Sequence, residues 1–259
     1  MKNRIAALLA ALAVGGSLVL VSTGVVAAAS PATAPNLPFG SAACSSDRVA
    51  LRSGATVEKL QAIGNCEIDR RLATLNALAA KISSSRVLSS SDAAALSAIV
   101  SSDKSGLTSL RATIDAETDV TALKADLLKI VTDYRVYVLV VPQVNLVNAA
   151  DAVVATQARF ATVNTNLSAR IAAAKAAGKD VTAAQADLDA MNSDVAAAVA
   201  LATPIPGKLL PLTPADYNGG TAGPVITAAR ADLVKARDDV RSAIAAAQAC
   251  RDALKALGA

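Results

Sequence analysis

Apolar residues recur at alternating three- and four-residue steps through most of this chain, and this spacing constrains the fold most. The clearest run begins at Val120 and keeps one register through four heptads. Such spacing puts apolar side chains on one face of an α-helix, whereas a strand would alternate apolar and polar residues. The stripe positions are Val120, Leu123, Leu127, Ile130, Tyr134, Tyr137, Val141, Val144 and Asn148. The pattern predicts an all-α protein.

Residues 133–151, DYRVYVLVVPQVNLVNAAD, form the most unusual block, with two of the three tyrosines and many β-branched residues. Because the heptad register passes through it, we interpret it as a buried helical segment. Pro142 should kink this helix, since it lacks a backbone donor. The apolar run is shorter than the roughly 20 residues of a membrane span. The predicted core block is Tyr134, Tyr137, Val141 and Val144.

Long helices joined by short turns predict an elongated, antiparallel, coiled-coil-like bundle over residues 46–259. The last helix, from about Pro224 to Leu257, has one stripe row of large residues and one of small residues. Residues 203–223 hold four prolines and four glycines, so a long loop is expected there. The two rows are Ile226, Leu233, Val240, Ala247 and Leu254, and Ala229, Ala236, Ala243, Cys250 and Leu257.

The N-terminus predicts export. Lys2 and Arg4 precede an uncharged apolar stretch, and small residues follow it, as in a secretory signal peptide. We expect a signal peptide over 1–29, cleavage after Ala29, and a Pro/Ala/Ser-rich flexible linker over 30–45; an uncleaved membrane anchor is the alternative. The mature protein should be secreted, extracellular or associated with the cell wall, without stable membrane insertion.

Three cysteines in an exported chain allow one disulfide and one remaining thiol. We favour Cys66–Cys250, because it would tie the first strong helix to the last and leave Cys44 free. The alternative, Cys44–Cys66, would close a local loop and leave Cys250 buried.

Composition removes several classes of function. The chain has no histidine, which excludes Ser-His-Asp and Cys-His catalysis and histidine metal sites. The acids Asp115, Glu117, Asp119 and Asp126 match a calcium loop poorly, because Val120 stands where glycine is needed. Scarce aromatics and evenly mixed charges argue against nucleic-acid binding. We therefore expect no catalytic residue, cofactor or metal. Asp133 and Asp151, which flank the apolar run, are expected to pair with Arg135 or with arginines on neighbouring helices.

The segments DYRVYVLVVP, NAAD, CEIDRRLATLNALAAKI and PLTPADYNGG resemble a group of uncharacterised, secreted, alanine-rich helical proteins of actinobacteria. The YRVYVLV-x-P block is the distinctive part of this resemblance. The group implies export and a helical fold but supplies no activity or site residue.

These observations together favour a non-catalytic exported protein that acts as a structural or interaction module of the cell envelope or medium. Its partner would be a protein or an envelope component, and a homodimer is compatible with the alanine-rich outer faces. The alternative is a carrier of a small apolar ligand near Val136–Val147. An enzyme is the least favoured reading.

Overall fold

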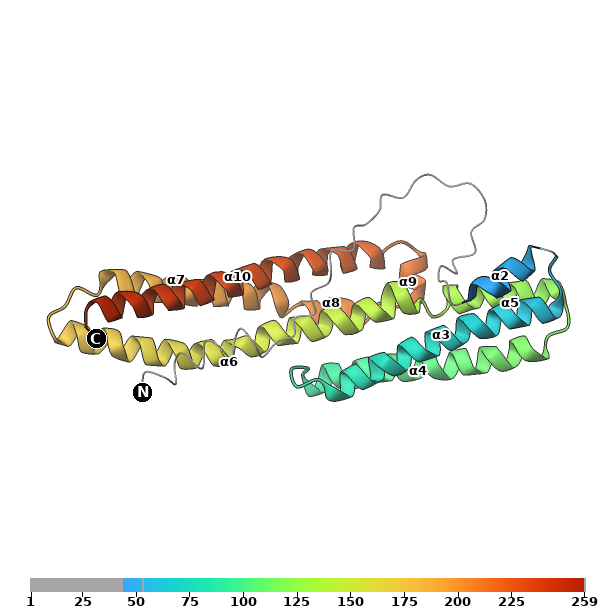
Figure 1. Ribbon diagram of the computed structural model, residues 1–259, viewed down its shortest axis with the longest axis horizontal. Helices are drawn as coiled ribbons and strands as arrows, with labels where there is room; N and C mark the ends of the chain where they lie inside the picture. The colour runs from blue at the N-terminus through green and yellow to red at the C-terminus, as the bar shows by residue number, and fades with distance from the viewer. Residues whose placement is uncertain (1–43, 53, 259) are drawn as a thin grey trace. The chain divides into compact units, whose positions relative to one another are not determined.

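The computed structural model describes residues 44–52 and 54–258, and these residues form helices and turns with no strand among them (Figure 1). The all-α prediction is confirmed. The predicted signal peptide, the cleavage after Ala29 and nearly all of the linker lie outside the described residues.

Within the expected bundle domain, the described residues form two compact units. The N-terminal unit contains residues 44–145 and 208–226, and the C-terminal unit contains residues 146–207 and 227–258. The unit boundaries fall within two long helices, α6 (Val141–Ala176) and α10 (Ala222–Ala256), each of which contributes most of its length to the C-terminal unit.

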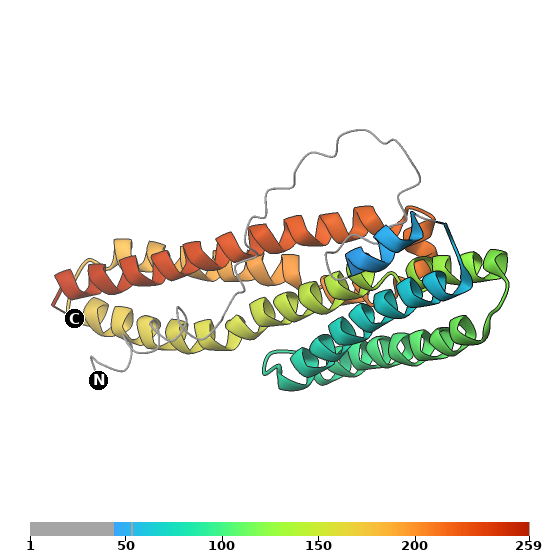
Figure 2. The same ribbon diagram turned by 45° about the vertical axis from the view of Figure 1, so that its right-hand side comes forward.

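The N-terminal unit is built around three helices, α3, α4 and α5, which begin at Val57, Ser90 and Val120. They lie side by side in both views (Figures 1 and 2). Side-chain oxygens of Thr56, Ser89 and Asp119 accept backbone N–H groups at the starts of these helices and so satisfy donors that the helices leave unpaired. Short α2 packs on the first of them. The elements are α2 (Ser45–Leu51), α3 (Val57–Ser84), α4 (Ser90–Ala116), α5 (Val120–Thr132), the π-helix η2 (Val136–Val140) and α9 (Pro214–Asn218).

The C-terminal unit packs α6, α7 (Thr182–Ala202) and α10 around one apolar core (Figure 1). Gly178, with φ 75°, supplies the left-handed residue that ends α6. Met191 of α7 and Cys250 of α10 are fully buried in this core. The large residues of this core come mostly from α6 and α7, whereas α10 adds Ala243, Ala247, Cys250 and Leu254.

The long helix expected through the tyrosine block is interrupted. Helix α5 ends at Thr132, and Arg135 follows with φ 45°, the one described non-glycine residue with positive φ. A π-helical turn then runs from Val136 to Val140, closed by the N–H of Val141 donating to the carbonyl of Val136. The continuous register predicted for this segment is therefore wrong between Ile130 and Val144.

Pro142 lies in the first turn of α6, where a missing N–H costs little, rather than in the middle of a kinked helix. The irregularity falls on the residues before it. In a regular α-helix the N–H of residue 142 would pair with the carbonyl of Val138, and proline has no such N–H. The wide turn of η2 ends where that bond would have been lost.

Residues 203–223 are not one irregular loop, which corrects the prediction for this segment. They contain α8 (Ile205–Leu209) and α9. Helix α9 opens with a capping box, in which the Thr213 hydroxyl accepts the N–H of Asp216 and the Asp216 carboxylate accepts the N–H of Thr213. Pro206 and Pro214 stand in the first turns of α8 and α9, where proline is tolerated, so they do not prevent these helices.

The helical run from Val120 to Ala176, taken as one, is long and apolar enough to cross a membrane by length and composition. The expectation that its apolar part is too short is therefore wrong. The most apolar part of this run is 44% buried inside the protein, and Arg135 interrupts the run with a left-handed backbone conformation. The absence of membrane insertion stays a prediction.

Candidate functional site

The interruption at Arg135 is held by α9. The Nε of Arg135 donates to Asn218 Oδ1 over 2.6 Å, and Asn218 Nδ2 donates to the carbonyl of Thr132 over 2.9 Å. The Arg135 guanidinium also lies 5.2 Å from the centre of the Tyr217 ring. A non-glycine residue in the left-handed region costs about 1–3 kcal/mol, so these contacts stabilise a conformation the chain would otherwise avoid. The expected pairing of Arg135 with Asp133 is replaced by this hydrogen bond to an amide.

Gln143 holds the C-terminal end of this interrupted segment through side-chain hydrogen bonds. Its side chain is 1% exposed, and its Nε2 donates to the carbonyls of Leu209 and Leu212 over 2.8 and 3.0 Å. The segment 209–218 is thus tied to both ends of the 132–143 region by side-chain amides. Sequence reasoning missed both contacts, because the partners are more than sixty residues apart in the chain.

The π-helical turn changes which side chains of the tyrosine block face outward. Tyr137 is 37% exposed and Val138 39% exposed, whereas the predicted core block placed Tyr137 inside. Val144 is buried as predicted, and Tyr134 and Val141 are half-buried. A wide turn advances the chain by more residues than an α-helical turn, so the buried positions shift. The buried valines and leucines of this stretch are Val136, Leu139, Val140, Val144 and Val147.

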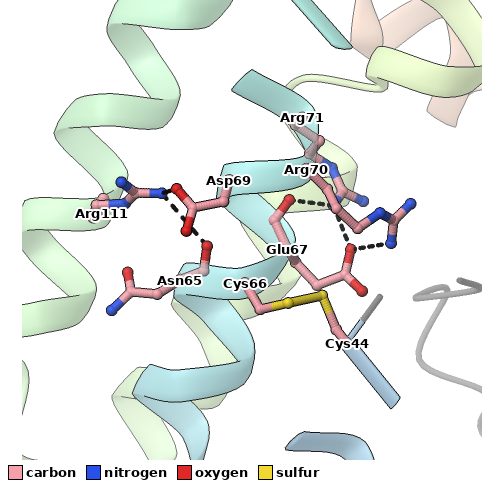
Figure 3. Close-up of a disulfide and its surroundings, with 8 residues drawn as sticks. All are labelled: Cys44, Asn65, Cys66, Glu67, Asp69, Arg70, Arg71 and Arg111. Atoms are coloured by element: carbon pink, nitrogen blue, oxygen red, sulfur yellow. Dashed lines mark hydrogen bonds and ion pairs between the residues drawn. A yellow bond between two sulfur atoms is a disulfide. The ribbon is translucent and has the colours of Figure 1, made fainter. Parts of the chain in front are cut away.

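Tyr137 lies against two arginines of α3. The guanidinium carbons of Arg70 and Arg71 are 5.1 and 5.2 Å from the centre of its ring, within the range of cation–π contacts. Glu67 accepts hydrogen bonds from both arginines through the same oxygen, Oε2, at 2.7 and 2.8 Å (Figure 3). We call Glu67, Arg70, Arg71 and Tyr137 the Tyr137 cluster.

Glu67 is an unusual member of this cluster, because its side chain is fully buried. Its second oxygen, Oε1, has no hydrogen-bond partner among the described residues. A buried carboxylate is costly unless it is paired, and here two guanidiniums supply the pairing. Glu67 therefore holds both arginines in place through these hydrogen bonds. The ring of Tyr137, on η2, contacts their guanidinium groups.

The disulfide lies beside this cluster and corrects the predicted pairing. It joins Cys44 to Cys66, one residue before Glu67, with 5.9 Å between the two Cα atoms (Figure 3). The favoured pairing Cys66–Cys250 is wrong, and the alternative is the one formed. Cys250 is a free, buried thiol, and burial raises its pKa, which makes it a poor nucleophile.

A second polar group lies where Tyr134 meets α4. The ring of Tyr134 fills the space beside Gly106, where an added Cβ would come within 2.5 Å of Cε1. Asp103 lies one helical turn before Gly106, and its Oδ2 is buried without a partner among the described residues. Burial raises the pKa of Asp103 to about 7. Burial and the carboxylates of Asp133 and Asp103 likewise raise the pKa of Tyr134.

The acids of the poor calcium-loop match cap and brace helices instead. Glu117 accepts the N–H groups of Thr118 and Asp119, and Asp119 caps α5. Asp126 accepts a hydrogen bond from Lys129. Within residues 44–52 and 54–258, no group of three or more acids and cysteines could hold a metal ion.

A pocket of about 540 Å³ opens at the turn between α6 and α7. Its charged lining mixes both signs, with Lys175 and Lys179 facing Asp180 and Asp189. The Asp180 carboxylate accepts the N–H of Thr182, the first residue of α7. This balanced lining selects no class of ligand, and the pocket is not formed by the residues Val136–Val147 proposed for a carrier.

Scans against protein-family models, curated proteins and solved structures returned no match to this chain.

Proposed function

We propose that this protein is a non-catalytic, exported interaction module, and that it binds its partner through the Tyr137 cluster together with Val138. The observation that carries this proposal is the outward placement of Tyr137 by a left-handed residue and a π-helical turn. Strained backbone and π-bulges concentrate at functional sites. Tyrosine and arginine are also among the residues that contribute most to binding at protein interfaces.

Export is supported by two features. The N-terminal sequence has the pattern of a signal peptide, and the Cys44–Cys66 disulfide is consistent with a protein outside the cytoplasm. Location in the medium or at the cell wall, and membership of the actinobacterial group with the YRVYVLV-x-P block, are parts of the same proposal.

The interaction module is favoured over the apolar carrier because of how the valines are placed. Val136, Leu139, Val140, Val144 and Val147 are each at most 2% exposed. They are therefore filled core positions, whereas Tyr137 and Val138 of the same block are 37% and 39% exposed. The features available to a partner are thus on the surface of η2.

The test is differential capture from the medium and envelope of the native host. Immobilised wild-type protein is compared with Tyr137→Ala and Val138→Ser, and with Val234→Ser as the matched control. Val234 is 53% exposed on α10, in the C-terminal unit. We expect one set of proteins to be retained by wild type and control and lost by both η2 variants. Equal retention by all four would refute the proposal.

A further inference from the structure

We infer that residues 34–43 of this same chain dock on the Tyr137 cluster and Val138, with Phe39 as the apolar anchor, and that a partner must displace them. This inference rests on the proposed function and adds a contact within the chain that regulates the same surface.

The place where the described chain begins carries this inference. Cys44 is the first described residue, and the disulfide holds its Cα atom 5.9 Å from that of Cys66 (Figure 3). Cys66 directly precedes Glu67 on α3, and Arg70 follows one helical turn later. Residues 34–43 therefore join the described chain beside the Tyr137 cluster.

The length of chain before Cys44 is sufficient to reach this surface. Phe39 is five residues before Cys44, and five residues span at most about 17 Å. Arg70 is four residues beyond Cys66, which is a rise of about 6 Å along α3. The ring of Tyr137 lies 5.1 Å from the guanidinium carbon of Arg70, so it is within reach of Phe39.

The surface offers hydrogen-bond donors next to apolar groups. The Arg70 side chain is 21% exposed, and it uses one nitrogen of its guanidinium for Glu67, which leaves further N–H donors. The Tyr137 hydroxyl makes no hydrogen bond within the described part of the chain. The ring of Tyr137 and the side chain of Val138 are 37% and 39% exposed as residues. A segment with neutral acceptors and apolar side chains matches this surface.

Residues 34–43, APNLPFGSAA, have this chemistry and carry no charge. Each of the two prolines has a carbonyl but no N–H, so the segment has more backbone acceptors than donors. Leu37 and Phe39 supply apolar side chains for the Tyr137 ring and Val138. Proline also restricts the free chain, which lowers the entropy lost on docking.

The disulfide makes docking an intramolecular event. A short tether gives an effective concentration in the millimolar range, so contacts that are weak between separate molecules suffice to occupy the surface. The apparent affinity for a partner then falls in proportion to the fraction of molecules in which the surface is free. The segment therefore sets a threshold that a partner has to exceed.

The direct test is a photo-crosslinking variant of the full mature protein, Phe39→benzoylphenylalanine. After irradiation and reduction of the disulfide, mass spectrometry maps the cross-linked peptides, and we expect those that contain residues 67–71 or 136–138. The matched control is Val49→benzoylphenylalanine. Val49 is 60% exposed and lies five residues after Cys44 on α2, which leads toward the start of α3. This control should not label residues 136–138.

A second measurement tests the anchor. A synthetic peptide of residues 34–43 is titrated by calorimetry into the full mature protein carrying Phe39→Ser. We expect binding, and we expect the peptide that itself carries Phe39→Ser to bind about tenfold more weakly, because it lacks the buried ring. Adding Tyr137→Ala to the protein should weaken binding of the unchanged peptide as well. Circular dichroism establishes that both protein variants are folded.

The regulatory part is tested by capture of the native partner. If the segment occupies the surface in half to nine-tenths of the molecules, Phe39→Ser should raise the apparent affinity for the partner about two- to tenfold. Equal affinity of Phe39→Ser and wild type would overturn the inference, because the segment would then not compete. Cross-links from position 39 that miss residues 67–71 and 136–138 would overturn it as well.

The proposed function fails on a different result. If capture is insensitive to Tyr137→Ala in both the wild-type and the Phe39→Ser background, the partner binds elsewhere. The cross-link map and the peptide titration are obtained without any partner, so they decide separately whether residues 34–43 dock on this surface.

Discussion

Burial follows the heptad pattern through the C-terminal unit, but it departs from the pattern at one place in the N-terminal unit. In the C-terminal unit the apolar stripe of α7, which includes Leu188, Met191, Val195 and Ala198, is buried. The predicted rows of α10 are also largely buried, with Val240 and Leu257 half-exposed. In the N-terminal unit the pattern holds up to Ile130 and again from Val144, but Tyr137 between them is exposed. A heptad count therefore described long regular helices correctly and failed at one short interruption.

This difference shows where the heptad pattern predicts buried positions and where it does not. Ile130 and Val144 lie two heptads apart and are both buried, so the count is right at both ends of the interruption. A left-handed residue and a π-turn alter the rotation of the chain locally without changing its composition. Residues 136–147 include six valines and two leucines, so several registers are similarly apolar. The sequence pattern cannot choose among them, but packing and backbone hydrogen bonds can.

The largest expected effect separates a core aromatic from an outward one. Phe160 of α6 is 2% exposed, and Phe160→Ala should lower the free energy of unfolding by about 3–5 kcal/mol, because it removes buried area and leaves a cavity. Tyr137→Ala removes mainly cation–π contacts and should cost about 1 kcal/mol. Urea unfolding of both variants measures the difference. If both variants lose a similar unfolding free energy, Tyr137 is packed in the core as in the predicted continuous helix, which would contradict its outward placement.

The disulfide gives the second effect. The bond spans 22 residues, and loss of such a cross-link destabilises by about 3 kcal/mol, chiefly because the unfolded chain gains freedom. The double variant Cys44→Ser/Cys66→Ser should therefore weaken the N-terminal unit. Cys250→Ala in the C-terminal unit removes only a small buried side chain and should cost much less. Mass mapping without reduction should recover a Cys44–Cys66 peptide, and a Cys250-linked peptide would contradict the structure.

Helix class and helix faces could be predicted from the sequence wherever a helix is long and uniform. The helix end at Gly178 and the cap at Asp119 are features that local rules can predict, because the groups involved lie within a few residues of each other. The ordered segment 203–223 could not be predicted, because its helices depend on contacts with Gln143 and Arg135 that are distant in sequence. Its prolines and glycines indicated a loop when judged locally.

The candidate site was predictable only in part. The tyrosine block drew attention by composition, but Glu67, Arg70 and Arg71 carried no signal of their own, since charged residues are common on helix surfaces. One available sign was the placement of Glu67 beside Ile68 and Cys66, on the side of α3 that turned out to be buried. The disulfide pairing was misjudged because a long-range tie seemed more stabilising, whereas the chain forms the cross-link nearest in sequence.

A smaller effect tests the notch that seats Tyr134. Gly106→Ala would place a Cβ 2.5 Å from Tyr134 Cε1 and 2.7 Å from its hydroxyl oxygen. Overpacking typically costs 1–3 kcal/mol and the better helix propensity of alanine returns about 1, so we expect a net loss of about 1 kcal/mol. Gly207→Ala is the control, because nothing lies within 4 Å of its added Cβ. Thermal melts compare the two, and a stabilised Gly106→Ala variant would show that the notch is not filled.

The smallest expected effect is a pH dependence that only the N-terminal unit should show. The pKa of Asp103 is about 7 in the folded protein against an ordinary value of 3.8, so folding favours the protonated carboxyl. This group's contribution to stability is complete below about pH 4 and is lost as pH rises through 7. The Asp103 side chain is partly exposed, so solvent screens this effect. The free energy of unfolding should therefore fall by about 1 kcal/mol, which is less than the full pKa shift would imply. Asp103→Asn should therefore be more stable than wild type at pH 8 and equal to it near pH 4.

Denaturant melts across this range measure how the free energy of unfolding changes with pH, that is, its slope. Asp189→Asn, in the C-terminal unit, is the matched control. A slope that persists in Asp103→Asn would place the titrating group elsewhere and leave the Tyr134 notch without a pH-sensitive partner.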